Sequence, residues 1–190
     1  MMADFPVKVE NVVAVAMFGV EFQLEKLLSQ TERTEYEPEQ FPGLVYRPAG
    51  LPGVAALIFS SGKVVCTGSR TVEGARDALE KVAQKMRENG FAVPKDFSVS
   101  IENIVASSKL KGQLKLEELA LSLENAEYEP SQFPGLVFRL PDPRVSFLLF
   151  STGKIICTGA RNVEDVQKAL QKLKERLKAA GIKAEPDRGE

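Results

Sequence analysis

Two stretches of the sequence are near-copies of one another, and this duplication restricts the possible folds more than any other feature. Residues 36–47 read YEPEQFPGLVYR and residues 128–139 read YEPSQFPGLVFR, which agree at 10 of 12 positions. A second pair, LIFSSGKVVCTG at 57–68 and LLFSTGKIICTG at 148–159, agrees at 8 of 12. The offset is 92 residues in the first pair and 91 in the second, so the first copy holds one additional residue between its motifs.

A period of this length is too long for a solenoid, whose units span about 20–50 residues. The 190-residue chain therefore reads as two copies of one unit related by pseudo-two-fold symmetry. We place the copies at 7–92 and 97–183, between an N-terminal tail (1–6) and a C-terminal tail (184–190). The C-terminal tail is expected to be mobile, as chain ends often are.

Each copy is expected to contain the same elements in the same order. A strand is followed by a short amphipathic helix, three strand-like runs joined in part by tight Ser-Gly or Thr-Gly hairpins, and a long closing helix with a single apolar stripe. In the first copy the expected ranges are 7–15, 21–30, 44–47, 54–60 and 63–67, with the stripe on Val72, Ala75, Leu79, Val82 and Met86. In the second copy the opening strand and short helix are 99–107 and 114–123, with the stripe on Val163, Val166, Leu170, Leu173 and Leu177.

The hairpin strands are apolar on both faces, which is unusual for an antiparallel sheet. One set of alternating positions holds Ile58, Val64 and Cys66, and the other holds Leu57, Phe59, Val65 and Thr67. Two helices per copy, each with one stripe, can cover one face, and an apolar face left open usually marks a binding surface. The alternative is that helices cover both faces, and the pattern alone does not decide between the two.

Two asparagines favour the open face. Asn11 and Asn103 occupy the same repeat position in the middle of an apolar strand, with Val13 and Val105 on the same side. Burying an amide without a partner costs about 1–3 kcal/mol, so a face that meets hydrogen-bonding groups is indicated. Carboxamides among small apolar side chains suit the minor-groove edge of A·T pairs, which offers only acceptors, whereas the amine of guanine would have no room there.

The repeated motifs EYEPEQFPGLVYR and LIFSSGKVVCTG resemble those of the TATA-box-binding proteins, of the compact archaeal type, over nearly the whole chain. The resemblance implies an α+β fold in which two pseudo-symmetric repeats form a saddle, with a curved ten-stranded antiparallel sheet and four helices on its convex face. It also implies a general transcription initiation factor that binds TATA-box promoter DNA in the minor groove. The family kinks DNA by about 80° with inserted apolar wedges, a value that belongs to the family and does not follow from this sequence.

The family's DNA-contacting positions map onto this chain residue by residue. The wedges correspond to Phe41 and Phe59 in the first copy and to Phe133 and Phe150 in the second. The asparagines that bond the central base pairs correspond to Asn11 and Asn103. The groove floor corresponds to Val13, Leu57, Val65, Thr67, Val105, Leu148, Ile156 and Thr158, and the phosphate clamps to Arg47, Lys63, Arg139, Arg144 and Lys154.

The resemblance also implies protein partners. In each copy a loop carries the first wedge. In this family the loop of the second copy contacts transcription factor B, so Glu129 and Gln132 are expected to bind that factor. RNA polymerase is recruited through transcription factor B. Two positions depart from the repeat: Gly53 stands where the second copy has Arg144, and Ser131 stands where the first copy has Glu39. The resemblance therefore does not extend to one phosphate contact of the first copy and to part of the transcription factor B contact of the second.

Two other classes of function compete with DNA binding. An enzyme domain or ligand carrier is disfavoured because the open face shows no carboxylate pair, histidine base, glycine-rich phosphate loop or metal cluster, so no cofactor or metal is expected. The chain has no histidine, and Cys66 and Cys157 are expected to be core residues. A dimerisation module is the third alternative, because an exposed apolar face also allows a homodimer without DNA. Without a membrane segment or leader, an intracellular, chromosome-associated protein in the cytoplasm of an archaeon is expected.

Overall fold

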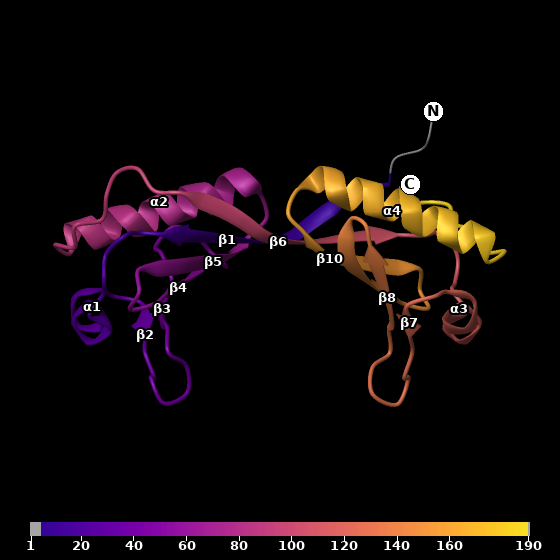
Figure 1. The fold of residues 1–190 in the computed structure, drawn as a ribbon, viewed down its shortest axis with the longest axis horizontal. Coiled ribbons are helices and arrows are strands. Elements are labelled where there is room, and N and C mark those ends of the chain that lie inside the picture. Colours follow the sequence, from indigo (N-terminus) through magenta and orange to yellow (C-terminus); the bar gives the residue numbers. More distant parts are fainter. Residues whose placement is uncertain (1–4, 190) are drawn as a thin grey trace. The chain divides into compact units, whose positions relative to one another are not determined.

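The computed structural model describes residues 5–189, which form two compact units (Figure 1). The first unit spans 11–102, and the second takes in the described residues of 1–10 and 103–190. The predicted order of elements is found in both halves of the chain. In the first half it is β1 (Lys8–Met17), α1 (Leu24–Gln30), β2 (Thr34–Glu35), β3 (Leu44–Tyr46), β4 (Ala55–Ile58), β5 (Lys63–Ser69) and α2 (Val72–Glu88). In the second half it is β6 (Val99–Lys109), α3 (Leu116–Ser122), β7 (Ala126–Glu127), β8 (Leu136–Pro141), β9 (Arg144–Leu149), β10 (Lys154–Ala160) and α4 (Val163–Ala179).

The ten strands belong to one sheet, and every strand pair whose register is described is antiparallel. In the first half the strands follow the order β2-β3-β4-β5-β1, and in the second the order β6-β10-β9-β8-β7. The predicted α+β class with ten antiparallel strands and four helices is confirmed. Strands β2 and β7 are two residues long each, which is too short for the alternation of side chains to reveal them.

The two short helices begin later than predicted. Helix α1 begins at Leu24 rather than at residue 21, and α3 at Leu116 rather than at 114. The cause is a backbone hydrogen bond to the neighbouring hairpin in each unit: the N–H of Phe22 donates to the carbonyl of Ser60 at 2.9 Å, and that of Leu114 to Ser151 at 2.8 Å. A residue held beside a hairpin in this way is still in the connecting chain and cannot start the helix.

The closing helices begin at side-chain caps. The Thr71 hydroxyl accepts a hydrogen bond from the backbone N–H of Gly74 at 2.9 Å, and the Asn162 side chain accepts one from Asp165 at 2.7 Å. Such caps satisfy backbone N–H groups that have no partner within the helix. Each helix then lies along one side of its unit's strands (Figure 1).

The core of each unit lies between its closing helix and the sheet. The stripe residues Ala75, Leu79, Val82 and Met86 of α2 are fully buried, as are Ile58, Val64 and Cys66 on the strands. In α4 the stripe is buried from Val166 to Leu177, but Val163, also predicted for the stripe, is 38% exposed. It is the first residue of the helix.

The chain ends are packed against the second unit as far as they are described. The expectation of a mobile C-terminal tail is wrong for residues 184–187: Ala184 is fully buried, Pro186 forms a β-bridge with Leu110, and Asp187 pairs with Lys109 at 3.1 Å. The free edge at the end of β6 supplies the backbone partners that hold this segment. Of the predicted N-terminal tail, 1–6, residues 1–4 lie outside the described part, and Phe5 is buried with its carbonyl bonded by Gln167.

No helix in the described part of the chain has the length and apolar character needed to cross a bilayer.

Candidate nucleic-acid interface

One face of the strands in each unit is only partly covered. On β4 and β5, Ile58, Val64 and Cys66 are fully buried, while the alternating residues Leu57 and Val65 keep part of their surface exposed. The second unit repeats this division, with Leu149, Ile155 and Cys157 buried and Leu148, Ile156 and Thr158 half-buried. Within each unit, the alternative that helices cover both faces is therefore wrong. The half-buried set of residues is called the open face below.

The predicted floor residues all belong to the open face of their unit. All are half-buried, and four of them form pairs in register: Leu57 pairs with Val65, and Leu148 with Ile156. Two further valines, Val45 and Val137, pair with Leu57 and Leu148 and are half-buried too. They were missed from the sequence, because Leu44, Val45 and Tyr46 are all apolar and the letters do not show that only the middle one is partly exposed.

Asn11 and Asn103 are bonded within the chain. The amide Oδ1 of Asn11 accepts the backbone N–H of Gly68 at 2.7 Å, and its Nδ2 donates to the Thr67 hydroxyl at 2.9 Å. In the second unit Asn103 makes the same bonds, at 2.7 Å with the Gly159 N–H and 3.1 Å with the Thr158 hydroxyl. The inference from an unpartnered amide is corrected accordingly: each asparagine has partners, and they lie on the neighbouring strand.

Each of these glycines lies in a β-bulge. Between β1 and β5 the paired positions move from Val12–Ser69 to Ala14–Cys66, so β5 holds one residue more than β1 over this stretch. The same shift occurs between β6 and β10, where Cys157 and Ala160 pair with Ala106 and Ile104. Gly68 has φ +97° and Gly159 φ +105°, a region that favours glycine.

The predicted wedges form one aromatic pair in each unit. The rings of Phe41 and Phe59 lie edge to face with centroids 5.7 Å apart, and those of Phe133 and Phe150 lie 6.0 Å apart. Phe41 is 38% exposed and Phe133 41%, which is high for phenylalanine.

A glycine and a turn hold each aromatic pair. A Cβ atom on Gly135 would approach Phe133 to 2.7 Å and Phe150 to 3.1 Å, so a side chain there would displace the rings. The backbone N–H groups of Gln132 and Phe133 both donate to the carbonyl of Glu129 at 2.9 Å, which closes the turn before the phenylalanine. Gly43 and the corresponding turn in the first unit repeat this geometry.

The predicted phosphate clamps are all exposed, on the strands or directly beside them. Arg47 follows β3, and Lys63 and Lys154 begin β5 and β10. Arg139 is already paired, with its guanidinium 2.9 Å from the carboxylate of Glu127, although both side chains are more than half exposed. An ion pair this exposed contributes only about 0–1 kcal/mol, so a phosphate can replace the carboxylate.

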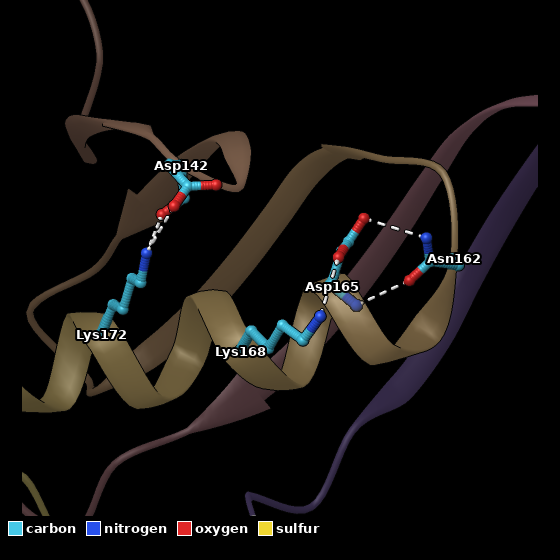
Figure 2. Close-up of polar contacts among 5 residues, drawn as sticks. All are labelled: Asp142, Asn162, Asp165, Lys168 and Lys172. Atoms are coloured by element: carbon cyan, nitrogen blue, oxygen red, sulfur yellow. Dashed lines mark hydrogen bonds and ion pairs between the residues drawn. The ribbon is translucent and has the colours of Figure 1, made fainter.

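Arg144 is the first residue of β9, directly after the turn that joins β8 to β9, and a lysine from α4 holds this turn. Figure 2 shows the Lys172 side chain reaching Asp142, where its ammonium group donates to the carboxylate at 3.0 Å and to the backbone carbonyl. Arg144 and Arg139 line one shallow hollow together with Ser146, Thr158 and Gly159. The matching loop of the first unit has Gly53 in place of Arg144, whereas the position of Lys172 is again a lysine, Lys81.

The two thiols lie under the open face. Burial raises the pKa of Cys66 to about 11 and that of Cys157 to about 12, so both are neutral thiols at pH 7. Within residues 5–189, no three His, Cys, Asp or Glu side chains come together in a way that could hold a metal ion. Glu129 and Gln132 are exposed on the loop that carries Phe133.

Comparison with known proteins identifies relatives over almost the whole chain. Residues 6–89 and 98–180 match the family model described as transcription factor TFIID, or TATA-binding protein. A TATA-box-binding protein of Methanosphaera stadtmanae is 49% identical over 176 residues, which cover 93% of this chain and 96% of that protein. One from Archaeoglobus fulgidus is 46% identical over 183 residues, covering 95% and 100%. The solved structure of the Methanococcus jannaschii protein superposes with a TM-score of 0.83 at 43% identity, covering 91% of this chain and 98% of that one.

Proposed function

The chain belongs to the TATA-binding protein family of transcription factors, and from this premise we propose that it binds A·T-rich promoter DNA through the open face. The family is one of DNA-binding factors and not of enzymes, and bound DNA is bent by insertion of the two phenylalanine pairs into the minor groove. The bent complex then recruits transcription factor B and RNA polymerase.

The observation that carries this proposal is the pair of half-exposed phenylalanines in each unit. Two rings packed edge to face on a glycine present a rigid apolar edge, and water contact with such an edge is unfavourable. A base step that has been partly unstacked offers apolar surface of matching shape, and apolar wedges between base steps are the usual means of kinking DNA from the minor groove. The occurrence of the same device in both units supports two kinks.

The chemistry of the open face supports a preference for A·T pairs. Besides the phenylalanines it presents aliphatic side chains, two asparagines and two threonines, and none of the predicted floor residues is charged. Such a surface fits a groove edge without a protruding amine, which in the minor groove means A·T rather than G·C. The exposed arginines and lysines then supply the phosphate contacts on which affinity depends.

The test is an equilibrium titration of labelled duplexes, one carrying a TATA-like element and one G·C-rich duplex of equal length, at several salt concentrations. We expect binding to the TATA duplex to be stronger by about three orders of magnitude or more, as is typical of specific complexes. Equal affinity for the two duplexes at every salt concentration would contradict the proposal.

Recruitment of transcription factor B is tested on the loop residues. Glu129→Ala and Gln132→Ala should weaken the ternary complex of protein, TATA duplex and transcription factor B while leaving binary DNA binding unchanged. Glu37→Ala is the matched control, because Glu37 closes the same turn in the first unit. Equal effects of Glu37→Ala and Glu129→Ala would show that the second loop has no special role.

A further inference from the structure

We propose that Gly68 and Gly159 are specificity-determining positioning residues: their backbone N–H groups fix the amides of Asn11 and Asn103 so that each amide presents only a hydrogen-bond donor to the DNA. The inference rests on the proposed function and deepens it, since it assigns the rejection of G·C pairs to the β-bulges. The two glycines touch no base in this account and act through the asparagines.

The orientation of each amide follows from the glycine. A backbone N–H can only donate, so the amide atom that faces it at 2.7 Å must be the oxygen. Rotating the amide by 180° would set an NH2 group against the N–H, with the loss of a hydrogen bond and repulsion between two donors. The Nδ2 group is thereby directed away from the glycine in both units.

The remaining hydrogens can be counted. One N–H of Nδ2 donates to the threonine hydroxyl next to the glycine, at 2.9 Å for Thr67 and 3.1 Å for Thr158. In the described part of the chain no acceptor is recorded for the second N–H, and both asparagines are half-buried, so water reaches them. Each asparagine therefore has one N–H available to a ligand on the open face. Its oxygen accepts the glycine N–H and is not available there.

The bulge is what brings the glycine N–H to this position. In a regular antiparallel ladder the N–H of every second residue points to the adjacent strand and pairs with its backbone, whereas an additional residue turns one N–H out of the ladder. The positive φ values require glycine here, and at Gly68 a Cβ atom would lie 1.9 Å from the carbonyl oxygen of Gly53. At Gly159 the nearest backbone atom, the Arg144 oxygen, would be 3.2 Å away.

The consequence is a choice between base pairs. A·T pairs show only acceptors in the minor groove, which an outward N–H can satisfy, whereas the guanine amine is itself a donor. An asparagine free to rotate could turn its oxygen toward that amine and accept from it. An asparagine held by the bulge glycine cannot, so the preference is built into the fold before DNA arrives.

The competing explanation is that the asparagines only hold the bulge and do not read bases. Asn103→Asp separates the two, because a carboxylate still accepts the Gly159 N–H and the Thr158 hydroxyl but offers no donor. The added negative charge weakens binding to every duplex. The informative quantity is therefore the ratio of affinities for two TATA-like duplexes that differ at the central pairs, one with inosine·C and the other with G·C. These duplexes differ only by the guanine amine.

For the unmodified protein we expect the inosine duplex to bind about 10- to 100-fold more tightly. The Asn11→Asp and Asn103→Asp variants should reduce that ratio to within about threefold, with the same folded circular dichroism spectrum. A ratio that is unchanged in both variants overturns the proposal.

The glycine itself is tested by Gly159→Ala, which disturbs the bulge and should reduce the ratio at least about fivefold. Gly181→Ala is the control, because Gly181 has a similar φ of +80° and open space around it but supports no asparagine. Gly159→Ala with an unchanged ratio overturns the role of the glycine. If that variant does not fold, hydrogen exchange of the Gly159 amide is measured instead. Exchange should be slow in the unmodified protein and fast in Asn103→Ala, and equal rates overturn the role of the glycine. Failure of the unmodified protein to bind any TATA duplex would count against the proposed function and not against the bulge.

Discussion

Phe133→Ala should separate the stability of the fold from its action on DNA. Phe133 keeps 41% of its surface exposed, so little more than half of its side chain is removed from water by folding. Full burial of a phenylalanine contributes about 1.5–3 kcal/mol, and an aromatic pair adds about 0.5–1.5 kcal/mol. We therefore expect unfolding to become easier by about 2 kcal/mol, which corresponds to a fall in Tm of about 4–8 °C for a chain of this size.

The effect on DNA should be larger. Unstacking a base step costs a few kcal/mol, and without the inserted ring nothing offsets that cost at one of the two kinks. The DNA bend, measured by energy transfer between dyes at the two ends of a TATA duplex, should fall clearly at a temperature where the variant is folded. Affinity for the duplex should fall by about 30-fold or more, the equivalent of about 2 kcal/mol.

Phe147→Ala is the matched control. Phe147 is fully buried on the covered side of β9, so its truncation should destabilise the protein by about 3–5 kcal/mol. Its folded fraction should nevertheless bend DNA normally. The reasoning is refuted if Phe133→Ala bends DNA like the unmodified protein, or if bending in the two variants follows their stability.

Three further predictions concern the phosphate rim and the thiols. Arg144→Ala should lower the slope of log affinity against log salt by about one unit, without a change in Tm, when duplex binding is titrated from low to moderate salt. Lys172→Met should weaken DNA binding several-fold, although Lys172 lies on helix α4 and not on the open face. The substitution removes the ion pair with Asp142 and leaves that carboxylate unneutralised beside Arg144. Asp142→Asn in the same protein should restore part of the lost affinity, and no recovery would argue against this explanation. Cys66 and Cys157, whose raised pKa values favour the neutral thiol in the folded state, should resist alkylation in the native protein at pH 8, and the free energy of unfolding should fall as pH rises from about 9 toward 11–12.

Much of the fold was predictable because duplication supplied two independent versions of each pattern. Cys66 was predicted to be a core residue, and the structure confirms it, with Ile58 of the same alternating set fully buried as well. Phe41 was predicted to lie on a loop, and it is 38% exposed there. These features depend on side-chain size and on local backbone restrictions, which the sequence states directly.

The remainder depends on contacts between distant residues. The partner of Asn11 is 57 positions away at Gly68, and it exists only because a bulge shifts the register between β1 and β5. Nothing in the letters around Asn11 reveals a register shift in another strand. The same holds for the segment after residue 183, which was expected to be mobile as a chain end but which finds backbone partners at the end of β6.

The central claim is that the open face grips A·T-rich DNA and bends it, and a measurement of the bend tests this most directly. End-to-end energy transfer should be recorded on a TATA duplex and on a G·C-rich duplex of the same length, each saturated with the unmodified protein. We expect a bend near the family's value of about 80° on the TATA duplex and little change on the other. A TATA duplex that is saturated with protein and still straight would contradict the account.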